Sequence, residues 1–216
     1  MKRTHGYSLA SVILIAAILA AFWVHARSIR KEQATAETLP NHIADWQQYD
    51  GIWQGDRGNF SDLKDGRGDK AVAGNPNLGD YDVSTDIRFD SDRNSEWGDA
   101  GIVLRVSNAS IGTDSYDGYY IGLRLRDQAL IFSRSEDEYF ELATAKLPAA
   151  IQIGAWYQLR VHAQNCTFRV VVTKDSDEIA KINYDDGACR FKTGQVGARA
   201  YSVQSSWRNF QVQLLH

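Results

Sequence analysis

A chain of 216 residues accommodates one globular domain and an extension, whereas two domains of ordinary size would need more sequence. Its 17 glycines, 10 tyrosines, 8 phenylalanines and 6 tryptophans, against one methionine, favour strands and tight turns over helices. The formal net charge of −3, with basic residues scattered through the domain, argues against a nucleic-acid-binding protein.

The N-terminal part has the composition of a membrane-directing segment followed by a linker. Residues 1–7 are short and basic, and the first 17 residues of the segment 8–25 are uncharged and almost wholly apolar, which is close to the minimum for crossing a bilayer. We predict an uncleaved transmembrane anchor; the alternative is a signal peptide cleaved near Val24-His25-Ala26. Residues 26–42 are polar and are predicted to form a stalk or linker.

From residue 43 to residue 216, short alternating segments separated by turn residues predict an all-β domain. In the segment 79–90, aromatic and β-branched residues occupy the odd positions and mainly polar residues the even ones, as in a half-buried strand. The other predicted strands lie in 45–60, 71–73, 97–126 (two strands), 128–135, 138–147, 155–163, 166–174, 178–185, 195–202 and 207–215. About a dozen short strands of this kind predict an antiparallel two-sheet jelly-roll sandwich.

The two strands in 97–126 carry the candidate functional face. In the first strand the even positions 102–106 are aliphatic and are predicted to face the core, which leaves Arg105 on the opposite face. In the second strand Tyr120 and Arg124 share that opposite face. Aromatic rings suit the C–H faces of sugars, and arginine suits hydroxyls, carboxylates or sulfates. The predicted ligand-binding residues on this face and at its rim are Trp97, Arg105, Tyr116, Tyr120, Arg124, Arg134 and Tyr139.

A purely structural role is the alternative for the two central arginines. Arg105 and Arg124 would then pair with acidic residues of neighbouring strands and only hold the sheet together. The acidic candidates for such pairs are Asp86, Glu96 and Asp99.

A set of short motifs follows the predicted strands: WQQYDGIW at 46–53, GDY at 79–81, GDAGIVLR at 98–105, DGYY at 117–120, GAWYQLRV at 154–161, TGQVG at 193–197 and WRNF at 207–210. Together they resemble the concanavalin A-like lectin/glucanase superfamily, in particular laminin-G-type modules, family 16 glycoside hydrolases and 3-keto-disaccharide hydrolase-like domains. The resemblance covers residues 44–214. It implies two curved stacked sheets with a concave face, which binds saccharide in many relatives, and it indicates fold better than activity.

The segment 136–141, EDEYFE, is the nearest match to the Glu-x-Asp-x-(x)-Glu strand of the catalytic family 16 enzymes. It departs from that pattern because Glu138 stands where the family has Asp, and it is predicted to be the solvated tip of a hairpin. Glu136 and Glu141 would also lie on opposite faces of a regular strand. No catalytic residue is therefore assigned.

The resemblance implies two further features. Laminin-G-type modules tie their late strands together with one disulfide, which here implies a bond between Cys166 and Cys189. A structural calcium ion is common in relatives, and Asp50, Asp80 and Asp185 are candidates to provide its oxygen ligands. No Asp-x-Asp-x-Asp loop fixes that choice.

These expectations combine into one predicted function. The chain is expected to be a single-pass membrane protein whose sandwich lies outside the cytoplasm, in the periplasm or at the cell surface, and binds glycan without cleaving it. The two cysteines and the predicted fold favour that side of the membrane. The alternatives are a glycoside hydrolase or lyase acting on polysaccharide, and a structural subunit that docks on an envelope protein.

Overall fold

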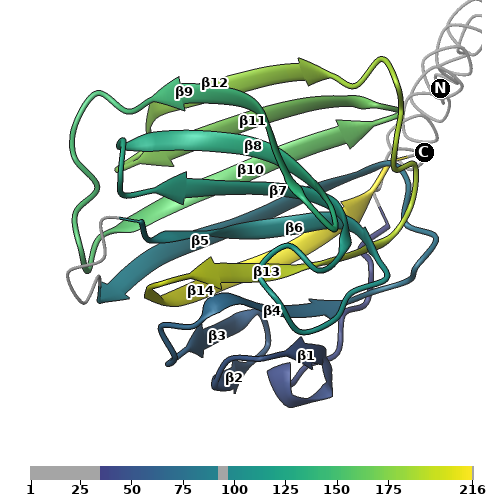
Figure 1. Ribbon diagram of the computed structural model, residues 1–216, viewed down its shortest axis with the longest axis horizontal. Helices are drawn as coiled ribbons and strands as arrows, with labels where there is room; N and C mark the ends of the chain where they lie inside the picture. The colour runs from purple at the N-terminus through teal and green to yellow at the C-terminus, as the bar shows by residue number, and fades with distance from the viewer. Residues whose placement is uncertain (1–34, 92–96, 216) are drawn as a thin grey trace, which may run out of the picture. The chain divides into compact units, whose positions relative to one another are not determined.

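In the computed structural model, residues 35–91 and 97–215 are described, and they form two antiparallel seven-stranded sheets stacked as a sandwich (Figure 1). The predicted all-β sandwich is thereby confirmed. Within these ranges the only helix is a single 3-10 turn, η1 (Ile43–Asp45), and no helix has the length and apolar character needed to cross a membrane. The predicted segments 1–7 and 8–25, and residues 26–34 of the predicted stalk, lie outside the described residues.

The first sheet, called sheet I here, contains in spatial order β1 (Gln47–Tyr49), β4 (Arg67–Ala73), β13 (Gln195–Tyr201), β6 (Asp99–Ser107), β7 (Asp117–Arg124), β8 (Ala129–Glu136) and β9 (Tyr139–Lys146). Sheet II contains β12 (Asp177–Asp185), β11 (Thr167–Lys174), β10 (Trp156–Gln164), β5 (Tyr81–Ser91), β14 (Gln204–Leu214), β3 (Asn59–Asp62) and β2 (Trp53–Asp56). Strands β6 to β9 pair in sequence order, as do β10 to β12. By contrast, β13 is inserted between β4 and β6 from far along the chain.

The core lies between the sheets and follows from the two-residue alternation of the strands. Ile121 of β7 and Phe132 of β8 point inward from sheet I, and Phe168 of β11 meets them from sheet II, with its ring 5.1 Å from that of Phe132. Trp207 of β14 spans the interior, because its indole N–H donates a hydrogen bond of 3.0 Å to the carbonyl of Gly101 in sheet I. The buried indole is therefore satisfied, and it links the sheets.

One residue of β6 breaks the alternation and corrects the sequence prediction. Arg105 has a positive φ of 52°, and the pairing of β6 with β7 shifts between Leu104 and Ser107, which is the pattern of a β-bulge. Because the bulge adds one residue, Arg105 turns into the interior and is fully buried, whereas Val106 turns to the opposite face. The sequence pattern had predicted the reverse for both residues.

Two connections complete the sandwich. Cys166, just before β11, is bonded to Cys189 in the loop after β12, with their Cα atoms 5.3 Å apart, which agrees with the predicted disulfide. Residues 36–42, which the sequence assigned to the linker, lie against β14: Ala36 pairs with Gln213, and the Glu37 amide donates to the carbonyl of Val212 over 3.0 Å.

Candidate functional site

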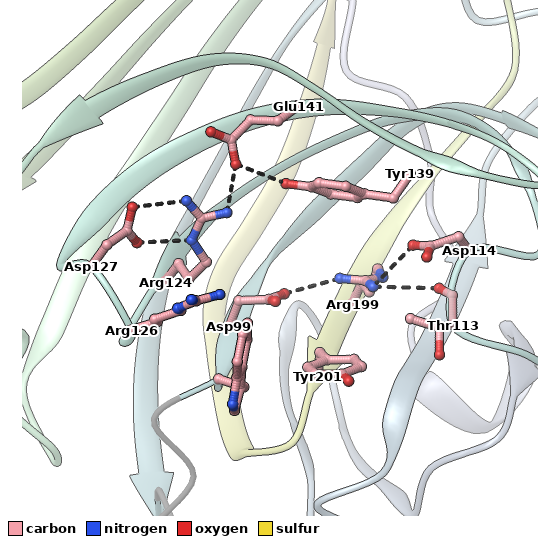
Figure 2. Close-up of a pocket in the computed structure, with 11 residues that line it drawn as sticks. Asp99, Thr113, Asp114, Arg124, Arg126, Asp127, Tyr139, Glu141, Arg199 and Tyr201 are labelled. Carbon is pink, nitrogen blue, oxygen red and sulfur yellow. Dashed lines mark hydrogen bonds and ion pairs between the residues drawn. The ribbon is translucent and has the colours of Figure 1, made fainter.

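A cavity of about 650 Å³ opens on the outer face of sheet I, which is the face turned away from sheet II. Its lining comes from the ends of β6 and β7, from β9 and β13, and from the loop between β6 and β7, and Figure 2 shows these side chains converging. We call it the sheet I cavity. This is the face that the alternating pattern of the two central strands predicted as a binding surface.

Two glycines at the centre of the outer face permit close approaches beneath the cavity floor. Gly101 and Gly122 are direct cross-strand partners in β6 and β7. A Cβ on Gly122 would collide with the hydroxyl of Tyr120, and a Cβ on Gly101 would collide with the carbonyl of Ile121. Glycine at position 122 therefore lets the Tyr120 ring lie over the strands, with its hydroxyl directed at Asp99, and glycine at position 101 lets the backbone of β7 approach closely.

The floor is a buried network centred on Asp99. Its Oδ1 accepts hydrogen bonds from the Tyr120 hydroxyl (2.6 Å) and from Nη1 of Arg199 (2.9 Å), and the Arg199 guanidinium lies 4.6 Å from the centre of the Tyr120 ring. Burial raises the pKa of Asp99, although Arg199 and the Tyr120 hydroxyl oppose that shift. The ion pair is thus fixed in position by groups that are themselves buried.

One wall is a second network, centred on Arg124. Its Nε and Nη2 donate to the two carboxylate oxygens of Asp127, both over 2.8 Å, and its Nη1 donates to Glu141 over 2.6 Å (Figure 2). The hydrogen bonds from Arg124 lower the pKa of Asp127 to about 2. The bidentate contact fixes the guanidinium plane. Tyr139 also donates to Glu141, over 3.3 Å, and 40% of this tyrosine is exposed.

The opposite wall is the loop between β6 and β7, which folds onto the sheet. Nη2 of Arg199 donates to the Thr113 carbonyl over 3.4 Å and approaches Asp114, while Ser135 donates to the Asp114 carbonyl over 2.6 Å. Deeper in the sheet, Nζ of the fully buried Lys70 donates to the Gly112 carbonyl over 2.7 Å. Burial lowers the pKa of Lys70 to about 8. The loop is therefore held by bonds to β4, β8 and β13.

The lip of the cavity consists of Trp97 and Arg126. Their meeting follows from the strand register: Asp99 pairs with Arg124, and the Leu125 amide donates to the Gly98 carbonyl, so Trp97 and Arg126 are the next pair outward. The Arg126 guanidinium lies 3.7 Å from the centre of the Trp97 ring. Half of Trp97 remains exposed, and Arg126 is exposed as well.

The structure divides the seven predicted ligand-binding residues into three groups. Trp97, Arg124 and Tyr139 line the sheet I cavity. Tyr116 and Tyr120 are buried on the same face, and Tyr120 bonds to the cavity floor, so neither side chain is open to a ligand.

Arg105 and Arg134 are not on the outer face. The Arg105 guanidinium donates to the carbonyls of Phe191 and Gly79, each over 2.9 Å, inside the sandwich. Arg134 pairs with the inward-pointing Tyr119, so strand alternation directs it to the inner side of sheet I, where it lies 4.7 Å from the Phe140 ring. The β-bulge therefore accounts for the burial of Arg105, whereas the pairing of Arg134 with Tyr119 places Arg134 on the inner side rather than at the rim of the outer face.

The cross-strand pairs considered for the arginines also differ from expectation. Arg124 bonds Asp127 and Glu141 rather than the acids named from the sequence. Asp86 instead bonds Arg208, and Glu96 lies outside the described residues.

Several cavity residues were missed by sequence reasoning. Asp99, Asp127, Arg199 and Tyr201 were not singled out as site residues, although Arg199 and Tyr201 share the two-residue spacing of a strand face that begins at Gly197. The sequence shows that spacing, but it does not show that β13 pairs with β6.

The acidic segment 136–141 forms the tip of the β8–β9 hairpin, as predicted. Nε of Arg190 donates a hydrogen bond of 3.0 Å to the Glu136 carboxylate, whereas Glu141 lines the sheet I cavity. The two glutamates therefore do not face each other across one site.

Two of the three aspartates that are candidates to bind calcium have other partners. The amide of Asn165 donates to Asp80 over 2.7 Å, and Lys64 bonds Asp50. Among the residues that the structure describes, no three His, Cys, Asp or Glu side chains are grouped as a metal site. The donor set for the calcium ion that the resemblance implies is therefore not assembled here, and calcium stays a prediction.

A scan against protein-family models finds no match to this sequence, and a search of curated proteins also finds none. Solved structures with the same fold include the carbohydrate-binding module CBM66 from Bacillus subtilis, with a TM-score of 0.60 and 15% identity over 78% of this chain and 94% of that one. The exoplasmic/lumenal domain of VIP36, bound to Ca²⁺ and Man3GlcNAc, has a TM-score of 0.58 and 12% identity over 79% of this chain and 83% of that one.

A GH43 protein from Bacillus licheniformis has a TM-score of 0.55 and 13% identity over 83% of this chain, but only 38% of that longer chain takes part. At such low identities the likeness establishes the sandwich fold, which carbohydrate-binding and glycosidase chains share.

Proposed function

We propose that this chain is a carbohydrate-binding module of the concanavalin A-like superfamily and that its ligand enters the sheet I cavity. We base this on one observation: exposed aromatic rings and fixed polar groups line a single cavity on a rigid sheet. Trp97 and Tyr139 offer apolar planes, while the carboxylate networks offer hydrogen-bond acceptors whose positions the arginines fix. Sugars need both, because each ring has C–H faces and a rim of hydroxyls.

The carbohydrate-binding module and the VIP36 domain with the same fold favour this function over docking on a protein. The cavity is also lined by seven charged side chains, whereas a protein-docking surface of this size would expose a dry apolar patch. We also infer, from the apolar residues 8–24, that a membrane anchors the module, and, from the disulfide between Cys166 and Cys189, that the module lies on the extracytoplasmic side. Protection of the domain from protease added to intact spheroplasts would contradict that location.

The test is affinity electrophoresis of the full-length chain, kept soluble in a mild non-ionic detergent, through gels that contain neutral or acidic polysaccharides. Trp97→Ala removes the exposed ring and is expected to weaken binding roughly fivefold, since one aromatic contact contributes about 1 kcal/mol. Trp156→Ala is the matched control, because Trp156 lies in β10 of sheet II. If Trp156→Ala abolishes retention and Trp97→Ala does not, the binding site lies on sheet II. If no polymer retains the protein, the proposed carbohydrate-binding function is wrong.

A glycoside hydrolase is the second candidate, favoured by one observation. In the sheet I cavity the pKa of Asp99 is raised by burial, while hydrogen bonds from Thr144 and Arg124 outweigh burial and lower that of Glu141. Divergent carboxyls of this kind can act as an acid and a base. Both, however, are held by arginines. New reducing ends in any retained polymer, lost in Glu141→Gln, would establish the enzyme.

A further inference from the structure

The charges in the sheet I cavity are partnered with one exception. Arg124 is bonded to Asp127 and Glu141, and Arg199 to Asp99 and Asp114. In the part of the chain that the structure describes, Arg126 has no carboxylate partner, and no dashed line reaches it in Figure 2. It is therefore the cation in this cavity that is open to a charge from outside.

Arg126 also contacts an aromatic ring at the lip of the cavity. Its guanidinium lies 3.7 Å from the centre of the Trp97 ring, a distance at which the two planes stack. Stacking uses the face of the guanidinium and leaves its N–H edge open. That edge donates two parallel hydrogen bonds, which match a carboxylate or a sulfate in shape and charge.

The interior of the cavity has the opposite character. Both donors to Asp99 bond its Oδ1, and Asp114 accepts from Arg199 only at 3.5 Å, so these two carboxylates keep acceptor capacity. They suit hydroxyl groups and repel anions. A negative group on a ligand is consequently directed outward to the lip, while its hydroxyls point inward.

We propose that the ligand is an acidic glycan: a hydroxylated sugar ring that carries one carboxylate or sulfate, with the anionic group bound by Arg126. This rests on the proposed function and names its ligand class. Arg126 is the specificity-determining residue, and Trp97 holds its guanidinium plane while offering the rest of its ring to the sugar.

The test uses the full-length chain in mild detergent and acidic polymers paired with neutral counterparts. The probes are polygalacturonate, alginate and hyaluronan, each also in carboxyl-reduced form, and dextran sulfate with dextran. Retention of an acidic polymer, with at least tenfold weaker binding of its neutral counterpart, is expected, because a hydrogen-bonded charge contributes about 1.5–3 kcal/mol. The polyuronates and dextran sulfate distinguish carboxylate from sulfate.

Arg126→Ala is expected to weaken binding of the acidic polymer at least tenfold and to leave binding of the neutral one within a factor of two. Arg126→Lys keeps the charge but not the planar fork and should fall between. The matched control is Arg160→Ala, which removes one exposed arginine from β10 of sheet II. An equal loss in Arg160→Ala would reveal non-specific attraction and overturn the proposal.

The remaining outcomes separate the two proposals. If neutral polymers bind as tightly as their acidic partners, the carbohydrate-binding function stands and the acidic ligand class is wrong. If no acidic or neutral polymer is retained, both are wrong.

Discussion

At the scale of single residues, Arg105 shows how far a side chain can move from its predicted role. Its guanidinium is fully buried, donates to the carbonyls of Gly79 and Phe191, and lies 3.7 Å from Asp80 and 5.1 Å from the Phe168 ring. We expect Arg105→Ala to lower the free energy of unfolding by about 3–5 kcal/mol, because it leaves a cavity and two carbonyls without a donor. Chemical denaturation measures this.

Arg126→Ala is the control for that measurement, since it removes an exposed arginine and is expected to change stability by less than about 0.5 kcal/mol. A comparable small loss in Arg105→Ala would show that the buried guanidinium does not hold the two carbonyls. It would also reopen a direct role for Arg105 in binding.

Two buried aspartates, Asp62 and Asp69, make the free energy of unfolding depend on pH. Asp62 of β3 points inward beside Ser205, and Asp69 of β4 points inward beside Ala200, so the two carboxyls approach from opposite sheets. In the described chain, Oδ2 of Asp62 and Oδ1 of Asp69 are buried without a donor. Burial, followed by the charge of Asp62, raises the pKa of Asp69 to about 7.

The native state therefore keeps a proton on this pair that the unfolded chain releases near pH 4. The stabilising contribution is complete below pH 4 and is lost as the pH rises toward 7, by on the order of 2 kcal/mol between pH 5 and pH 7.5. Asp69→Asn cannot ionise and should flatten this part of the stability profile. Denaturation midpoints at several pH values measure it, and parallel profiles for the two proteins would contradict the shared proton.

At the scale of strands, alternation predicted most of the sandwich, because each strand buries one face and leaves the other to solvent. The segment 79–90 became β5 with Tyr81, Val83 and Phe89 buried, as its pattern indicated. A bulge cannot be read from alternation, since its extra residue depends on how β6 meets β7 and β13.

The cavity could be predicted only in part for a related reason. Arg124 and its face were identifiable because strands β6 and β7 are neighbours in sequence. Arg199 comes from β13, 100 residues after Asp99, and their 2.9 Å contact exists only because β13 pairs with β6. Pairing between distant strands is decided by packing over the whole core rather than by the local sequence.

At the scale of the whole molecule, the question is where along the chain the folded sandwich begins. Residues 36–42 were predicted to be linker, yet they contact the sandwich. Leu39 packs against the core, the Pro40 carbonyl accepts a hydrogen bond of 3.1 Å from the Trp46 indole, and the Glu37 carboxylate accepts one of 3.0 Å from the Asn75 amide.

We therefore expect a fragment of residues 43–216 to be less stable than one of residues 36–216, by about 2 kcal/mol, because it loses these hydrogen bonds and the burial of Leu39. Thermal and chemical denaturation of the two fragments measure the difference. Glycan affinity is the internal control: the lining of the sheet I cavity begins at Trp97, so both fragments should bind equally at temperatures where both are folded. Equal stability of the two fragments would show that residues 36–42 act only as a linker. Unequal glycan affinity would mean that this segment supports the sheet I cavity through the core.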